Sequence, residues 1–113
     1  MCNSEVETPA HAFFYCSQIR TTGLALLGYA QRVVPALSPE SALRFELGKD
    51  LSEIEELATT CLLASGLKYI WEARAEKKQV VLFKMRAEVE AKIDILRRTR
   101  HKDAGELLFE IIG

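Results

Sequence analysis

The clearest hydrophobic pattern in this sequence covers residues 43–62. Apolar side chains recur there at steps of three, four or one, at Leu43, Leu47, Leu51, Ile54, Ala58, Cys61 and Leu62. The acidic residues of the same stretch fall between them, at Glu46, Asp50, Glu53 and Glu56. This spacing predicts one helix with an apolar stripe on one side and carboxylates on the other. Because an isolated amphipathic helix gains most of its stability from packing, the chain is expected to supply partner helices.

A first helix is expected before this stretch. Thr8 followed by Pro9 is typical of a helix start, since Thr caps the first turn and Pro needs no hydrogen-bond donor there. The helix is predicted over residues 9–34, with a weak point at Gly23, because glycine costs about 1 kcal/mol relative to alanine. Residues 1–8 are predicted to form a disordered tail ahead of a single bundle domain, residues 9–113.

The second helix starts with a similar signal, Ser38 followed by Pro39. It is predicted to run from residue 39 to about residue 74 and to continue through Gly66. A helix end at Ser65-Gly66 is the alternative, because glycine is the usual residue after a helix.

Two more helices complete the expected fold. The third is predicted over about residues 77–101, with an apolar stripe at Met85, Val89, Ile93 and Leu96. The fourth is predicted over residues 104–112, with Asp103 as its cap. No stretch alternates apolar and polar residues in the manner of a strand. The predicted fold class is therefore all-α, an up-down four-helix bundle with three long helices and a short fourth.

The charged residues are distributed unevenly, although the net charge of the chain is only −1. Residues 1–67 carry a net charge of −4, residues 68–102 carry +6, and residues 103–113 carry −3. An acidic and a basic segment in one small protein favour head-to-tail contact between copies, or a polyanion on the basic side.

The basic residues around the third helix are the strongest functional signal. This basic series consists of Lys77, Lys78, Lys84, Arg86, Lys92, Arg97, Arg98, Arg100 and Lys102. A solvated basic face, a nucleic-acid contact and a contact with an acidic protein surface all remain open for this set. Trp71, Tyr69 and Phe83 lie nearby in the sequence, where they either stack on bases or pack in the ordinary way.

No set of residues points to catalysis, so the protein is expected not to be an enzyme and to need neither a metal nor a cofactor. His11 and His101 are isolated and are expected at the surface. No Glu precedes a His by three residues, as di-iron bundles require, and no phosphate-binding or nucleophile motif occurs.

Cysteine usage and hydropathy favour a cytoplasmic protein without a membrane span. The three cysteines include no CxxC pair and are expected as reduced thiols. No apolar run is as long as the roughly 18 residues that a membrane helix needs. The N-terminal stretch MCNSEVETPAHAFF lacks the basic start of a secretory signal.

Four short motifs follow one another in a recognisable order. They are RFELG at residues 44–48, EAR and the following KK within residues 72–78, IDILRR at residues 93–98, and ELLFEIIG at residues 106–113. In this combination residues 24–113 resemble a four-helix-bundle family. That family includes the accessory variability determinant of diversity-generating retroelements and the proteins encoded by intervening sequences in bacterial large-subunit rRNA genes.

The resemblance implies a non-enzymatic bundle that assembles into a pentameric barrel. It further implies that a reverse transcriptase, RNA or DNA binds at nine basic residues, which are Arg74, Lys77, Lys78, Lys84, Arg86, Lys92, Arg97, Arg98 and Arg100. Family accessory proteins are markedly basic overall, and this chain is not. The alternative is a protein-only assembly module of a mobile element, in which the acidic second helix of one copy meets the basic third helix of the next.

Overall fold

The computed structural model describes residues 8–17 and 19–113, and every regular element among them is helical. The elements are η1 (His11–Tyr15), α1 (Arg20–Gln31), α2 (Pro39–Leu43), α3 (Glu53–Ala75), α4 (Leu82–Arg97) and α5 (Lys102–Ile112). The all-α class predicted from the sequence is confirmed for these residues. Residues 1–7 of the expected tail lie outside the described part of the chain.

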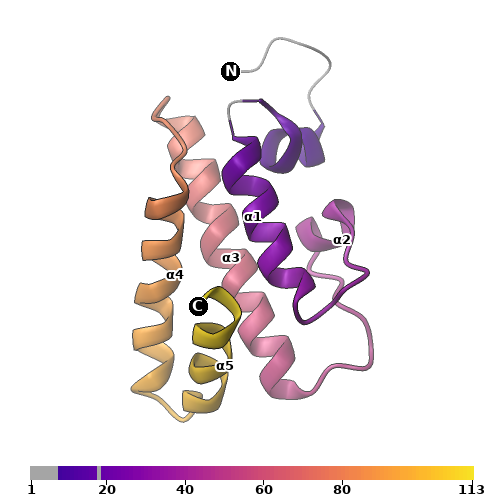
Figure 1. Ribbon diagram of the computed structural model, residues 1–113, viewed down its shortest axis with the longest axis vertical. Helices are drawn as coiled ribbons and strands as arrows, with labels where there is room; N and C mark the ends of the chain where they lie inside the picture. Colours follow the sequence, from indigo (N-terminus) through magenta and orange to yellow (C-terminus); the bar gives the residue numbers. More distant parts are fainter. Residues whose placement is uncertain (1–7, 18) are drawn as a thin grey trace.

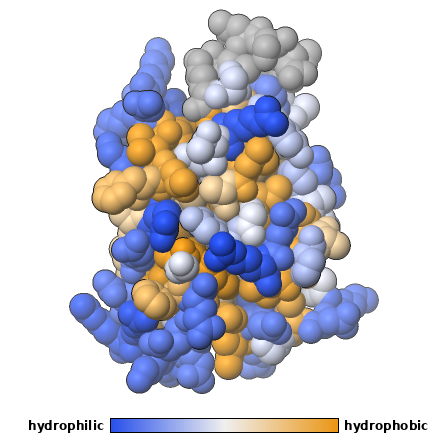
Figure 2. Space-filling view, viewed as in Figure 1, coloured by the Kyte–Doolittle hydropathy of each residue, from blue (hydrophilic) through white to orange (hydrophobic). Residues whose placement is uncertain are grey.

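Four helices, α1, α3, α4 and α5, contact one another, and consecutive members run in alternating directions (Figure 1). The α4 helix forms one edge of the molecule, and α5 ends about halfway along it. The short α2 lies beside α1, away from α4. Hydrophilic residues dominate the lower end of the face drawn in Figure 2 and also cross its middle, and hydrophobic residues reach the surface between them.

The expected first helix, residues 9–34, is wrong as one continuous element. Its start is as predicted, because the His11 backbone N–H donates to the Thr8 hydroxyl at 3.1 Å. A π-turn then closes where the Cys16 N–H donates to the His11 carbonyl at 2.8 Å, and Cys16 itself is extended. The chain becomes helical again at Arg20, so the break lies ahead of Gly23 rather than at it.

The 43–62 stretch is also not one helix. Ser38 caps α2 as predicted, since its hydroxyl accepts the Ser41 N–H at 3.1 Å, but α2 ends at Leu43. The Glu46 N–H donates to the Ser41 carbonyl, and Phe45 takes a positive φ of 56°, which is the Schellman arrangement that terminates helices. Residues 44–52 form a loop that still buries Leu47.

Ser52 and Glu55 begin α3 with a reciprocal capping box. The Glu55 N–H donates to the Ser52 hydroxyl at 3.1 Å, and the Ser52 N–H donates to the Glu55 carboxylate at 3.0 Å. The helix then runs through Gly66 to Ala75, which confirms the predicted continuation through this glycine; the alternative, a helix end at Ser65-Gly66, is wrong. A Cβ on Gly66 would stand 2.5 Å from Leu26 Cδ1, so this glycine lets α1 and α3 approach closely.

The last two helices are displaced from their predicted bounds. The third was expected from residue 77, but residues 78–81 are not helical and α4 begins at Leu82. Val81 is extended, and its N–H donates to the Tyr69 hydroxyl at 2.9 Å. Asp103 is not the cap of α5, because the helix already begins at Lys102 and Asp103 lies in its first turn. The Asp103 carboxylate therefore lies in the first turn of α5, where a negative charge interacts favourably with the positive end of the helix dipole.

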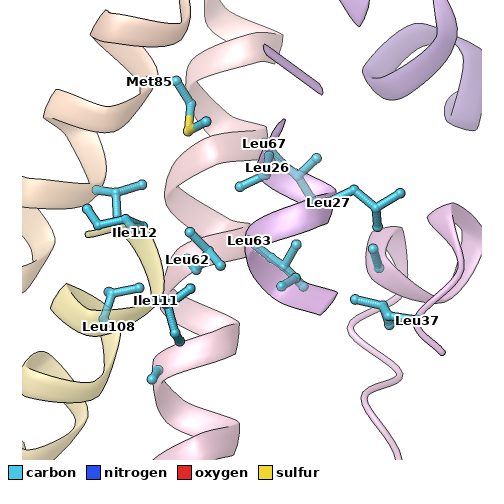
Figure 3. Packing of buried hydrophobic residues seen from close by; sticks show 14 of the residues in the cluster. Leu26, Leu27, Leu37, Leu62, Leu63, Leu67, Met85, Leu108, Ile111 and Ile112 are labelled. Carbon is cyan, nitrogen blue, oxygen red and sulfur yellow. The ribbon is translucent and has the colours of Figure 1, made fainter. Parts of the chain in front are cut away.

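The core lies where the four contacting helices meet (Figure 3). The predicted stripe of α4, Met85, Val89, Ile93 and Leu96, is buried. Its partners shown in Figure 3 come from α1, α3 and α5 and are Leu26, Leu27, Leu62, Leu63, Leu67, Leu108, Ile111 and Ile112. One apolar cluster thus joins the described helices, as expected from side chains that leave water together.

Candidate partner-binding surface

The nine predicted basic residues do not lie on one face. Three of them, Arg74, Arg86 and Arg97, are half-buried and bind other parts of the same chain. Lys78 pairs with its neighbour Glu76, and Lys92 is half-buried against α3. Only Lys77, Lys84, Arg98 and Arg100 are exposed and have no ion pair among the described residues.

Arg86 and Arg32 hold the carbonyl end of α5. Arg86 Nη2 donates to the Ile112 carbonyl at 3.0 Å, and Arg32 Nη1 donates to the Ile111 carbonyl. The last carbonyls of a helix have no partner within it and carry its negative dipole end, so cations are favoured there. Arg86, a predicted partner-binding residue, therefore performs a structural task.

Arg97 and Arg74 have intramolecular partners as well. Arg97 Nε donates to the Glu106 carboxylate at 2.9 Å, and its guanidinium lies 4.7 Å from the centre of the Phe109 ring. These contacts join the end of α4 to α5. Arg74 Nη1 donates to the Ala12 carbonyl at 3.2 Å, which ties α3 to η1.

The turn between α3 and α4 holds Lys77 and Lys78. The Lys78 N–H donates to the Ala73 carbonyl at 2.7 Å and Lys77 has a φ of 58°, so this helix end is a second Schellman arrangement. Lys78 Nζ lies 2.6 Å from the Glu76 carboxylate, whose hydrogen bond and negative charge raise the pKa of Lys78.

Lys92 lies close enough to α3 to act on Cys61. Burial raises the pKa of the Cys61 thiol, and the positive charge of Lys92 opposes that rise. Cys61 and the buried Cys16 are both free, as predicted. A half-buried thiol with a raised pKa is a weak nucleophile near neutral pH.

The exposed cations of the α4–α5 turn adjoin carboxylates. Arg100 and His101 line a groove of about 570 Å³ together with Glu53 and Glu56 of α3 and Asp103 of α5. The acidic start of α3 and the basic turn thus meet within a single copy. This proximity lowers the positive potential that a polyanion would meet.

The aromatic residues considered for base stacking are dispersed. Trp71 is 62% exposed, whereas Tyr69 is half-buried and its hydroxyl is engaged by the Val81 N–H. Two residues apart on a helix, they point about 160° away from each other around the axis of α3. Phe83 stands on a different helix, so the three do not form one stacking surface.

A feature that sequence reasoning missed is an apolar ridge on the solvent side of α4. The α4 ridge consists of Phe83, Ala87, Ala91 and Ile95, which recur every four residues and are all exposed. Phe83 is 79% exposed and Ile95 55%. The signal was the four-residue spacing, but the stronger stripe through Val89 had already been assigned to the core.

The other titratable residues considered from the sequence are the acidic start of α3 and the two histidines. Glu53, Glu55 and Glu56 occupy the first turn of α3, where carboxylates favour the helix dipole. Across residues 8–17 and 19–113, no three His, Cys, Asp or Glu side chains are placed to hold a metal ion. His101 is exposed as predicted, but the expectation of a surface His11 is wrong, because η1 folds it inward.

Comparison with known proteins leaves the family open. No protein-family model matches the chain, and neither curated proteins nor solved structures give a significant match. In the described part of the chain no helix has the length and apolar character to cross a membrane.

Proposed function

We propose that this chain is a non-enzymatic, protein-only assembly module that associates with copies of itself. The observation that carries the proposal is the α4 ridge, which leaves two large apolar side chains in water on one helix face. Contiguous apolar side chains on a protein surface mark sites of association more often than isolated ones do. The nine basic residues are dispersed and four of them, Arg74, Lys78, Arg86 and Arg97, are engaged within the chain, which favours this function over a polyanion-binding one.

The proposal includes an up-down four-helix bundle made of α1, α3, α4 and α5, with η1 and α2 as additions. Its support is the alternating direction of these helices around one apolar cluster. A cytoplasmic location is part of the same proposal. The free thiols of Cys16 and Cys61 support it, because reducing compartments keep cysteines unpaired.

Native mass spectrometry and sedimentation velocity over a concentration series test the assembly. We expect the proportion of oligomer to rise with protein concentration and to persist at high salt, because an apolar contact is not screened. A monomer at every concentration would refute the assembly function.

A second candidate function is an accessory protein that binds a reverse transcriptase or structured nucleic acid as a pentamer. One observation favours it: Arg98, Arg100 and Lys102 are all exposed within five residues of the α4–α5 turn. The order of the RFELG, EAR and IDILRR motifs supports it too.

Filter binding with a structured RNA at low and moderate salt tests the second candidate. If it holds, affinity falls steeply with salt, and the double substitution Arg98→Ala/Arg100→Ala flattens that dependence. The matched control Arg20→Ala/Lys49→Ala removes two exposed charges elsewhere. Binding that does not change with salt would exclude this function, as would equal effects of the two double variants.

A further inference from the structure

We infer that the α4 ridge pairs with the α4 ridge of a second copy of this chain, in an antiparallel contact with two-fold symmetry. The inference rests on the proposed self-assembly and adds its surface, orientation and symmetry. The proposed partner of the α4 ridge is therefore the same apolar helix face on another copy, running in the opposite direction.

The ridge has the geometry of a helix-packing surface. Its residues follow the four-residue rows of a helix, which are the rows that interdigitate in the commonest class of helix pairs. At 1.5 Å per residue, Phe83 and Ile95 stand about 18 Å apart along the axis. The ridge lies opposite the buried stripe of Met85, Val89 and Ile93, on a helix at the edge of the molecule (Figure 1).

The order of side chains along the ridge is symmetric about the level of Val89. Phe83 and Ile95 lie six residues to either side, and Ala87 and Ala91 lie two residues to either side. A two-fold contact centred there places Phe83 beside Ile95 of the second copy and Ala87 beside Ala91 of the second copy. Small residues at the centre allow the helix axes to approach, and the large ones cover the ends.

The helix dipoles favour the antiparallel orientation. A parallel pair of α4 helices would bring like ends of the two dipoles together, whereas an antiparallel pair places the positive end of each helix beside the negative end of the other.

The proposed contact consists of a single pair of helices, and this limits its strength. Stable protein interfaces bury about 1,200–2,000 Å² in total, and weak, transient ones bury less. A single ridge of four exposed residues belongs to the second class, so the dimer should be reversible and dependent on concentration.

Sedimentation velocity of the full chain tests the surface. Ala91→Arg places a long charged side chain at the closest approach of the two helices, and we expect the dissociation constant to rise by about tenfold or more. Ala64→Arg is the matched control, because Ala64 is an exposed alanine inside α3, away from the ridge. Both substitutions are on solvent-facing helix positions, so circular dichroism should report an unchanged fold.

The outcomes separate the inference from the function on which it rests. Dimers weakened by Ala91→Arg and not by Ala64→Arg support both. Dimers equally stable in the two variants, or a pentamer, overturn the inference and leave self-assembly standing. A wild-type monomer at every concentration overturns self-assembly itself.

Cysteine cross-linking tests the orientation. In a Cys2→Ser/Cys61→Ser background, a mixture of Phe83→Cys and Ile95→Cys chains should cross-link far more than either chain alone. Stronger cross-linking of Phe83→Cys to itself would indicate a parallel pair and overturn the antiparallel contact.

Discussion

Replacing Gly23 by alanine should destabilise the protein, although alanine is the better helix former. Gly23 lies inside α1, directly beneath the π-turn of η1. A Cβ at this position would stand 2.9 Å from Phe14 Cα and closer still to the Phe13 carbonyl oxygen. The obstacle is backbone, so no side-chain rotation relieves it, and η1 must move away from α1.

The magnitude follows from two opposing effects. Helix propensity favours alanine by about 1 kcal/mol. Against it, overpacking costs about 1–3 kcal/mol or more, and displacing η1 re-exposes the fully buried Phe14, which is worth about 1.5–3 kcal/mol. We expect a net loss of about 2 kcal/mol, which for a chain of this length lowers the Tm by about 8 °C.

Gly28 provides the matched control on the same helix. A Cβ there meets no atom within 4 Å, so Gly28→Ala should gain about 0.5–1 kcal/mol and raise the Tm by about 3 °C. Thermal and urea unfolding followed at 222 nm measure both variants. If Gly23→Ala proves as stable as Gly28→Ala, η1 does not rest on α1 as described and the reasoning fails.

Three further predictions concern helix ends and a thiol. Ser52→Ala should cost about 1 kcal/mol in urea unfolding, because it removes the capping box with Glu55; no change would mean the cap is not formed. Lys77→Gly should stabilise by about 1 kcal/mol by relieving its positive φ, and a loss would contradict the Schellman end. Folding raises the pKa of Cys61, so the folded state favours the protonated thiol. This contribution to stability is complete below the unfolded pKa of 9.0 and is lost as the pH rises through the folded pKa. The alkylation rate of Cys61, followed by mass spectrometry, should therefore rise at a higher pH than that of an unfolded cysteine, and Lys92→Gln should move the rise to still higher pH. A rate that rises at the same pH as in the unfolded chain would contradict the burial of this thiol.

The parts of the fold that local sequence signals specify were predicted well. Ser38-Pro39 starts a helix, the stripe through Val89 is buried, and α3 continues through Gly66. The apolar spacing of residues 43–62 misled because Leu43, at the end of α2, and Leu47, within the loop that follows, both contribute to the core although no helix joins them. Ile54 of the same stripe is 42% exposed, so the spacing also overstated burial. Apolar spacing does not fix the backbone between the apolar residues, and here the Schellman end at Phe45 stops the helix.

The candidate surface was predicted less well, for a physical reason. Charge content along the sequence indicates where cations occur but not which of them find acceptors after folding. Arg86 and Arg97 were grouped with Lys84 by sequence, yet they turn towards α5 and bind Ile112 and Glu106. Their contacts are 26 and 9 residues away along the chain, beyond what helical spacing reveals.

The two arginines that bind the carbonyl end of α5 are Arg32, the C-cap residue of α1, and Arg86 of α4, which are far apart in the sequence. An 11-residue helix would ordinarily open locally, independently of unfolding of the rest of the protein. Here, separation of α5 requires two guanidinium groups on different helices to release it together. Amide protons of Leu108 and Ile111 should consequently exchange with deuterated water as slowly as those of Leu62, in step with opening of the entire molecule.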